Sequence, residues 1–231
     1  MPESNIGFYG HVKQYHNLKP AIDQAILDVL ESGSYVLGPQ LVKFEGELAR
    51  YMKTKETVGV NSGTDALLLV FLALGLGPGD EVITTSNTFF ATAEAIWLAG
   101  ATPVFVDSDP RTRNIDVSKI EAAITSKTRA IVPVHLYGLT ADMPAIARIA
   151  KAHNLFVVED CAQGIGARGD TFAIGMGDCA EPGTFCRPEE KRNADWTLLN
   201  QGRITVGAVD SNRTYGGGDD RKLEKFVKNG K

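Results

Sequence analysis

The sequence is short of cysteine, of long apolar runs and of excess positive charge, and each shortage excludes a class of protein. The three cysteines, Cys161, Cys179 and Cys186, form no CxxC pair and no Cys/His spacing that would suit zinc, so we expect a reducing compartment and no metal site. The longest apolar stretch, residues 66–74, is too short to cross a bilayer. Residues 1–11 lack the apolar segment of a signal peptide. These absences predict a cytoplasmic protein with no membrane partner.

The charge balance argues against a nucleic-acid partner. There are 24 basic and 28 acidic residues, which gives a net charge of −4 and no basic footprint. The chain has 231 residues, of which 43% are hydrophobic and 23% charged. That is the composition of an ordinary globular protein, and it is enough for one large domain with a core or for two small ones.

Strand and helix patterns alternate through the first two thirds of the chain. Two amphipathic helices are predicted first, at 18–31, with Pro20 in its first turn, and at 41–51. Strands are predicted at 57–60, 81–85, 103–106, 130–134 and 155–159, and helices at 64–74, 90–98, 117–124 and 143–153. Such alternation predicts an α/β fold with a mostly parallel sheet and right-handed crossovers.

The composition changes after about residue 167. Residues 169–218 are rich in Gly, Asp, Asn and Arg and contain few periodic apolar runs. One short strand at 204–209 and a closing helix at 219–229 are the elements we predict there. We therefore expect two parts: residues 1–167 as an N-terminal segment with an α/β domain, and residues 168–231 as a divergent and partly disordered remainder of that domain.

The stretch VEDCAQGIGA, residues 158–167, is the centre of the predicted chemistry. Asp160 ends a buried strand, and the carboxyl edge of a parallel sheet is where α/β folds bind ligands. Its carboxylate could pair with a protonated ring nitrogen, or it could be a helix cap or a solvated turn acid. Gln163 could bond the same ligand or simply be exposed. The glycines at 164, 166 and 169 match G-x-G-x-x-G, but no convincing helix follows them, so a dinucleotide site is disfavoured.

Two other stretches begin helices directly after predicted strands. In NSGTDALLL, the amides near Gly63 and Thr64 could bind a phosphate. Alternatively, this is an ordinary helix start, with Ser62 or Thr64 as the cap and Asp65 complementing the helix dipole. In TFFATAEAI, Phe89 could stack on a heteroaromatic ring, although a staple or core aromatic is the commoner role. His135, which follows another strand, could be a ligand or a proton carrier, but a structural histidine is the commoner case.

Together these stretches resemble the DegT/DnrJ/EryC1/StrS family of pyridoxal-phosphate sugar aminotransferases. The similar segments, in chain order between residues 10 and 167, are SGSYVLGPQLVKFEGELARY, VGVNSGTDALLL, GPGDEVITTSNTFFATAEAI, GATPVFVDSDPRTRNIDVSKIEAAIT, RAIVPVHLYGLTADM and VVEDCAQGIGA. The resemblance implies a fold-type I transferase whose large α/β domain has a seven-stranded, mostly parallel sheet.

The same resemblance implies the cofactor, pyridoxal 5′-phosphate, and a role for each residue of the site. Gly63 and Thr64 would bind the cofactor phosphate, and Phe89 would stack on the pyridine ring. Asp160 would pair with the pyridine nitrogen, and Gln163 would lie near the ring hydroxyl. All five residues are present in the chain.

The chain departs from the family pattern after Ala167. The family lysine that bonds covalently to the cofactor lies in a G-D-x-x-x-F-S-F-x-P-x-K-like segment, and the nearest text here is GDCAEPGTFCRPEEKRNAD. By this resemblance, Lys191 would be the catalytic lysine and Thr184 a further phosphate ligand. By the resemblance, we expect the family's small C-terminal domain to be missing, which bears on activity and not on the fold.

The implied reaction moves an amino group from an amino-acid donor, expected to be glutamate, to a nucleotide-linked keto-sugar, in a homodimer. A truncated paralogue that only binds or dimerises is the alternative from another class. A related sugar dehydratase, which has a histidine in place of the lysine, is disfavoured because no histidine follows residue 167. A nicotinamide-dependent oxidoreductase is a distant further alternative.

Overall fold

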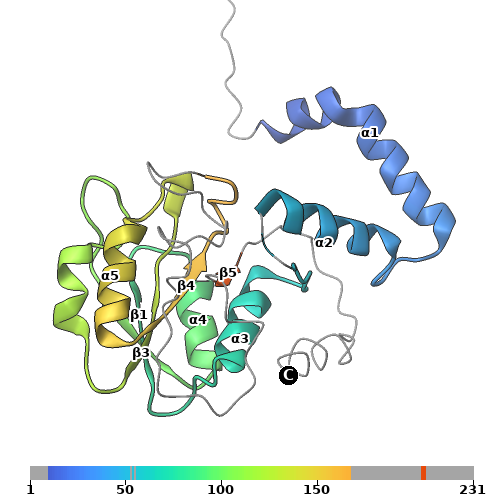
Figure 1. Ribbon diagram of the computed structural model, residues 1–231. Helices are drawn as coiled ribbons and strands as arrows, with labels where there is room; N and C mark the ends of the chain where they lie inside the picture. Colours follow the sequence, from blue (N-terminus) through green and yellow to red (C-terminus); the bar gives the residue numbers. More distant parts are fainter. Residues whose placement is uncertain (1–9, 53, 55, 168–203, 207–231) are drawn as a thin grey trace, which may run out of the picture. The chain divides into compact units, whose positions relative to one another are not determined.

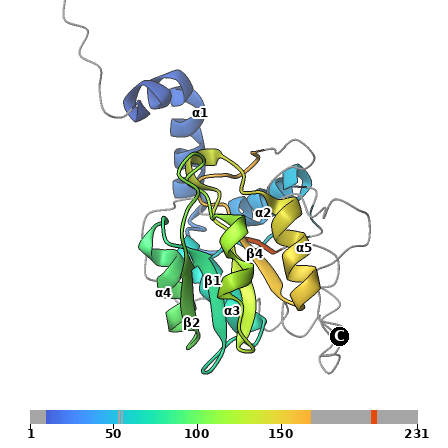
Figure 2. The same ribbon diagram turned by 90° about the vertical axis from the view of Figure 1, so that its left-hand side faces the viewer.

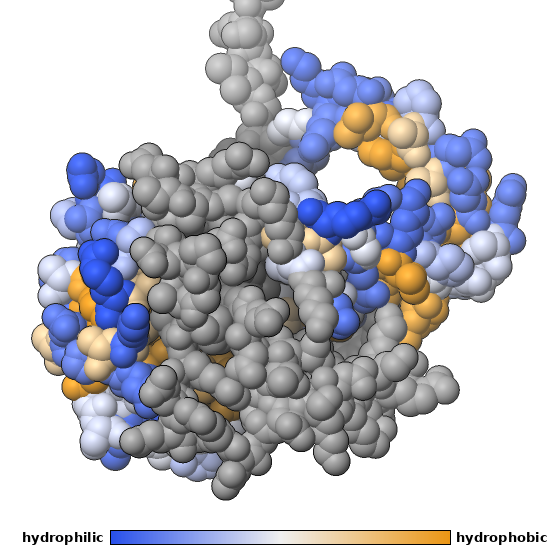
Figure 3. Space-filling view, in the orientation of Figure 1, coloured by the Kyte–Doolittle hydropathy of each residue, from blue (hydrophilic) through white to orange (hydrophobic). Residues whose placement is uncertain are grey.

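The computed structural model describes residues 10–52, 54, 56–167 and 204–206, and it divides the chain into two compact units, 1–47 and 48–231. The first unit holds α1 (His11–Ser32) and most of α2 (Pro39–Met52). α1 buries none of its residues, and Figure 3 shows apolar side chains among the hydrophilic ones on its surface. α1 ends at Gly33, whose positive φ of 65° suits a residue without a side chain.

The first helix begins earlier than predicted, at His11 and not at residue 18, so Pro20 lies inside it. Side-chain contacts span the proline. The Tyr15 hydroxyl donates to Asp23 at 2.9 Å, and the Lys19 ammonium donates to Tyr15 at 2.8 Å and pairs with Asp23. These bonds connect the turns on either side of the point where proline removes a main-chain hydrogen bond.

The second unit is built on a parallel sheet with the strand order β2-β1-β3-β4-β5 (Figures 1 and 2). Its strands are β1 (Glu81–Thr85), β2 (Thr102–Val106), β3 (Thr128–Val132), β4 (Phe156–Asp160) and β5 (Ile204–Val206). Every pairing between these strands is parallel, as the sequence predicted. The described residues hold five strands, so the expected total of seven stays a prediction.

Helices cover both faces of the sheet. α3 (Gly63–Ala73) and α4 (Phe90–Leu98) pack side by side on one face, and α5 (Met143–His153) lies on the other. The alternation of side chains along each strand separates two cores. Val82, Val132 and Val158 join the α3/α4 core, whereas Ile83, Ile131 and Val157 join the α5 core.

Two predicted elements differ in the structure. Residues 57–60 are not a strand, because they pair with no other strand among the described residues. The predicted helix at 117–124 is instead two short 3₁₀ turns, Val117–Lys119 and Glu121–Ala123. Apolar residues three apart suit both helix types. Asp116 caps the first turn, and the next residues already turn toward β3 through the Thr125 N–H bond to the Thr128 hydroxyl, which is 2.9 Å long.

No helix among the described residues combines the length and apolar character needed to span a bilayer. The cytoplasmic location and the division of the chain at residue 167 stay predictions.

Candidate functional site

The candidate site lies at the carboxyl edge of the sheet, where β1 and β4 end. α3 ends at Ala73 and joins the start of β1 through the short turn 74–80, so the first residues of α3 point to the opposite, carboxyl edge. α4 begins at Phe90, soon after β1 ends at Thr85. These connections bring the three sequence motifs to one edge of the sheet.

The alternation along β4 sends its two terminal carboxylates to opposite faces. Asp160 lies two residues after Val158 and so on the same face of the sheet, the face of the α3/α4 core. Glu159 lies two residues after Val157, on the face of the α5 core. Asp160 therefore faces α4, and Glu159 faces the turn that follows β3. The sequence placed Asp160 at the sheet edge, and the strand register decides which of the two acids meets α4.

Asp160 is a buried carboxylate with both oxygens hydrogen-bonded. Only 7% of the residue is exposed. Oδ2 accepts a 2.9 Å hydrogen bond from the Thr92 hydroxyl, and Oδ1 accepts a 3.1 Å bond from the Ala162 N–H. The alternative of a solvated turn acid is therefore wrong. A carboxylate oriented by two donors keeps lone pairs for a further, cationic donor.

Thr92 is the contact that sequence reasoning missed. It lies in the first turn of α4, is 1% exposed and also hydrogen-bonds the Thr88 hydroxyl at 2.9 Å. The available signal was its place three residues after Phe89, where a helix turn brings it back to the edge occupied by the helix start. Its partner Asp160 is 68 residues away in the sequence, a separation that periodicity does not bridge.

The start of α3 supplies the amides predicted to bind an anion. Ser62 caps this helix and accepts from the Asp65 N–H at 3.1 Å, while the Ala66 N–H bonds the Ser62 carbonyl. The hydrogen bonds of the described residues do not use the amides of Gly63 and Thr64. The helix start is thus both an ordinary N-cap, as one alternative proposed, and an open pair of donors.

Phe89 is the N-cap residue of α4 and is 77% exposed. The alternative of a core aromatic is therefore wrong for this residue. An exposed ring directly beside a helix start at the carboxyl edge leaves its face open to a ligand.

Gln163 is held by the turn that follows β3. Its Oε1 accepts from the Tyr137 N–H at 2.7 Å, which leaves the side-chain NH₂ group as its remaining donor. Tyr137 has a positive φ of 59° and is 73% exposed. This main-chain contact was not predicted from the sequence. A non-glycine residue in the left-handed region is a strained position that the neighbouring contacts must hold.

His135 and Glu159 form a fully buried pair on the α5 side of the sheet. The His135 Nδ1 accepts from the Ala141 N–H at 3.1 Å, so the ring proton lies on Nε2, which donates to Glu159 at 3.0 Å. This arrangement confirms the structural interpretation of His135. Cys161 lies close enough to complete a metal-ligating trio, but hydrogen bonds already occupy both ring nitrogens of the histidine.

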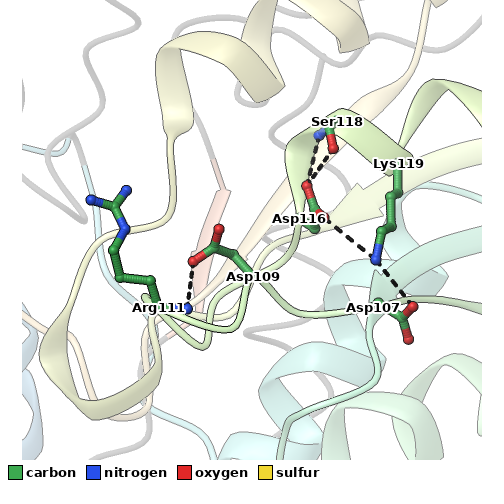
Figure 4. A network of polar contacts seen from close by, with 6 residues as sticks. All are labelled: Asp107, Asp109, Arg111, Asp116, Ser118 and Lys119. Carbon is green, nitrogen blue, oxygen red and sulfur yellow. Dashed lines mark hydrogen bonds and ion pairs between the residues drawn. The ribbon is translucent and has the colours of Figure 1, made fainter.

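A network of charges follows the end of β2 (Figure 4). The main-chain N–H groups of Thr112 and Arg111 donate to Asp109 and hold the pKa of its carboxyl below the ordinary value. The Ser118 hydroxyl does the same for the pKa of Asp116. Lys119 pairs with Asp107 at 3.2 Å, which raises the lysine pKa.

Asn114 ties this segment to the rest of the edge. Its side chain donates to the Leu139 carbonyl at 3.0 Å and accepts from the Leu136 N–H at 3.2 Å. The residue is buried. The segment after β2 and the turn that carries Tyr137 are thus held together by one amide side chain.

Lys191 and Thr184, the predicted cofactor lysine and second phosphate ligand, lie outside the described residues, as do the predicted closing helix 219–229 and the last residues of the 204–209 strand. The structure brings Asp160 and Thr92 into contact. It places Phe89 and Gln163 at the same sheet edge, and the connection of α3 to β1 places Gly63 and Thr64 there as well.

Comparison with known sequences finds curated relatives of this chain. The pleiotropic regulatory protein of Geobacillus stearothermophilus is 52% identical over 163 residues, which cover 71% of this chain and 44% of that protein. The UDP-2-acetamido-2-deoxy-3-oxo-D-glucuronate aminotransferase of Pseudomonas aeruginosa is 49% identical over 162 residues, covering 70% of this chain and 45% of that protein. The chain therefore spans less than half the length of these relatives.

Solved structures agree with the fold. The crystal structure of Streptomyces venezuelae DesV in complex with a ketimine intermediate matches with a TM-score of 0.69 and 49% identity, covering 71% of this chain and 44% of that one. The Bacillus subtilis NtdA structure with bound cofactor PMP matches with a TM-score of 0.63 and 45% identity, covering 65% of this chain and 34% of that one.

The family match covers the described residues of the candidate site. Residues 16–185, well over half of the chain, match the model of the DegT/DnrJ/EryC1/StrS aminotransferase family. The resemblance drawn from the six sequence segments is confirmed: the chain belongs to the DegT/DnrJ/EryC1/StrS aminotransferase family.

Proposed function

We propose that this protein is a pyridoxal-phosphate-dependent aminotransferase that acts on a nucleotide-linked keto-sugar. The observation that carries the proposal is Asp160, a carboxylate that is 7% exposed, lies at the carboxyl edge of a parallel sheet and is aimed by two donors. A carboxylate held in this way is suited to a protonated ring nitrogen.

The residues around Asp160 fit the parts of the cofactor. The Gly63 and Thr64 amides at the start of α3 suit its phosphate, because helix starts favour anions. The exposed ring of Phe89 suits the face of a heteroaromatic ring. The NH₂ group of Gln163, fixed by the Tyr137 contact, suits an anionic ring oxygen.

Pyridoxal phosphate, when bound, supplies an electron-accepting ring that stabilises negative charge on an adjacent carbon. In the proposed reaction, Asp160 holds the proton on the ring nitrogen and so keeps the ring electron-poor. Lys191 is the residue proposed to hold the cofactor covalently and to move a proton at the reacting carbon.

The proposed substrates rest on the relatives. The Pseudomonas aeruginosa relative is named for its action on a UDP-linked keto-sugar acid, which supports a nucleotide-linked keto-sugar here. Glutamate as amino donor, a homodimeric assembly and action in the cytoplasm complete the proposal. They rest on the family resemblance and, for the location, on composition.

A second candidate function is regulatory or binding activity without catalysis. The observation that favours it is the Geobacillus stearothermophilus relative, which is named as a regulatory protein and is 52% identical. Cofactor binding separates the two candidates, because a chain that only binds partners has no need of an oriented carboxylate opposite a ring.

The test is a titration of the 231-residue chain with pyridoxal phosphate, followed by absorbance. Asp160→Asn keeps the shape of the side chain and removes its charge, so we expect the dissociation constant to rise about ten- to a hundredfold, the equivalent of one charged hydrogen bond. Asp142→Asn is the matched control. Asp142 caps α5 and is exposed, and asparagine caps equally well, so its affinity should equal that of the wild type.

Absence of measurable binding by the wild-type chain would overturn the proposed function in favour of the binding candidate. Equal affinities for Asp160→Asn and wild type would show that Asp160 does not meet the ring nitrogen.

A further inference from the structure

We propose that Thr92, with Thr88 behind it, is a positioning residue that holds the Asp160 carboxylate in the orientation needed to meet the cofactor ring. This inference rests on the proposed function and deepens it. It is carried by the chain of contacts Thr88–Thr92–Asp160, in which each link is 2.9 Å long.

The direction of this chain follows from the chemistry of its members. The Thr92 hydroxyl has one hydrogen, and it donates that hydrogen to Asp160 Oδ2. The contact between the two threonines then has only one assignment: Thr88 donates and Thr92 accepts. Donation from Thr88 polarises the Thr92 hydroxyl and strengthens its bond to the carboxylate.

Burial makes the Thr92 contact demanding. Thr92 is 1% exposed and Asp160 is 7% exposed, so water does not readily replace a lost hydroxyl. Ala162 fixes the other carboxylate oxygen from the β4 side. One donor comes from α4 and the other from the turn after β4, and together they fix the orientation of the carboxylate.

The chain of hydrogen bonds Thr88–Thr92–Asp160 also links two ligand groups of the proposed site. Phe89 lies between Thr88 and Thr92 in the sequence, and its carbonyl accepts the Thr92 N–H at 3.2 Å. The helix start that presents the Phe89 ring therefore also aims Asp160. A displacement of this turn would change the orientation of both groups toward a bound ring.

If Thr92 only stabilised the packing of α4 on β4, its replacement would have a different effect. A valine in its place fills the same volume and keeps the apolar contacts. With a purely structural role, the valine substitution would change stability alone. With a positioning role, it would also change how the cofactor ring is held.

The experiment compares Thr92→Val and Thr92→Ser with Thr84→Val in the 231-residue chain. Thr84 is fully buried in the same sheet, but its hydroxyl donates to the Val132 carbonyl at 2.9 Å, so Thr84→Val makes the same chemical change away from Asp160. The readouts are the pyridoxal phosphate dissociation constant, the visible circular dichroism of the bound cofactor, which reports ring orientation, and the melting temperature of the apoprotein.

We expect Thr92→Val to raise the dissociation constant about tenfold, the cost of losing one hydrogen bond to a charged group, and to change the visible dichroism. Thr92→Ser, which restores the donor, should stay within about twofold of the wild type. Thr84→Val should bind as the wild type does, whatever its melting temperature. Where Thr92→Val does not fold, Thr88→Val carries the test, with an expected increase of about threefold from lost polarisation.

The positioning role of Thr92 is overturned, while the proposed function stands, if Thr92→Val binds the cofactor with wild-type affinity and dichroism. It is equally overturned if Thr92→Ser fails to restore them. If the wild-type chain binds no cofactor, the proposed function falls, and the role of Thr92 falls with it.

Discussion

At the scale of single residues, the site depends on which way two adjacent acids point. Glu159 and Asp160 follow each other at the end of β4, and the two-residue repeat of a strand sends one to His135 and the other to Thr92. A shift of β4 by one residue would exchange them. The buried His135–Glu159 pair therefore fixes the register on which the position of Asp160 depends.

Some residues of the candidate site could be proposed from the sequence, and others could not. Asp160, Gly63, Thr64, Phe89 and Gln163 were proposed as site residues from their positions after strands and from the family resemblance. Thr92 and Tyr137 were not, because their contacts join residues 68 and 26 positions apart. Such contacts depend on how the helices pack on the sheet, which local sequence patterns do not determine.

The Asp116 cap provides a prediction about pH at this scale. The Ser118 hydroxyl donates to Asp116 at 2.6 Å and is the main cause of the lowered pKa of that carboxyl. In Ser118→Ala we expect the Asp116 pKa to move up toward its ordinary value of 3.8. An NMR titration of the carboxyl carbon measures this directly.

The sign of the stability effect follows from linkage. Because the folded-state pKa of Asp116 lies below 3.8, the ionised carboxyl stabilises the fold at neutral pH, and this contribution is lost as the pH falls through the folded-state pKa. The difference in melting temperature between wild type and Ser118→Ala should therefore shrink from pH 7 to pH 3. Ser108 lies nearby but, among the described residues, makes no hydrogen bond to Asp116, so Ser108→Ala should show no such dependence. A difference that is constant with pH would contradict the assignment.

At the scale of elements, the most regular patterns predicted their structure well. The strand 81–85 and the helices 90–98 and 143–153 have the predicted bounds. The errors fall where local signals are ambiguous: a short apolar run at 57–60 without a partner strand, and a segment at 117–124 whose apolar spacing suits 3₁₀ turns as well as an α-helix. Tertiary contacts decide both cases.

The packing between two turns provides a prediction at this scale. A side-chain carbon added at Gly164 would lie 2.8 Å from the Cβ of His135, and that histidine is buried and held by two hydrogen bonds. Gly164→Ala should therefore reduce the free energy of unfolding by about 1–3 kcal/mol, the usual cost of overpacking. Chemical denaturation measures the change.

Gly46→Ala is the contrasting control. Gly46 lies within α2, and a side-chain carbon there would meet no atom within 4 Å. Alanine in a helix interior is better than glycine by roughly 0.5–1 kcal/mol, so this variant should be as stable as the wild type or more stable. Equal stabilities for the two glycine variants would refute the proposed contact of Gly164 with His135.

At the scale of the whole molecule, the site is assembled from segments spread over the second unit. The starts of α3 and α4, the end of β4 and the turns after β3 and β4 contribute its residues, and the sheet gives them a common edge. The α/β class with a parallel sheet followed from the alternation of strands and helices alone, whereas fold type I followed from the family resemblance. The family assignment needed several motifs in a fixed order, because any one of them also fits an ordinary helix cap or turn.

The central claim, that this chain binds pyridoxal phosphate covalently at the site defined by Asp160, is tested most directly by reducing the reconstituted protein with borohydride and mapping its peptides by mass. We predict a stable adduct on Lys191. An adduct on another lysine would keep the cofactor and disprove the assignment of Lys191. A wild-type chain with no adduct on any lysine would contradict the claim.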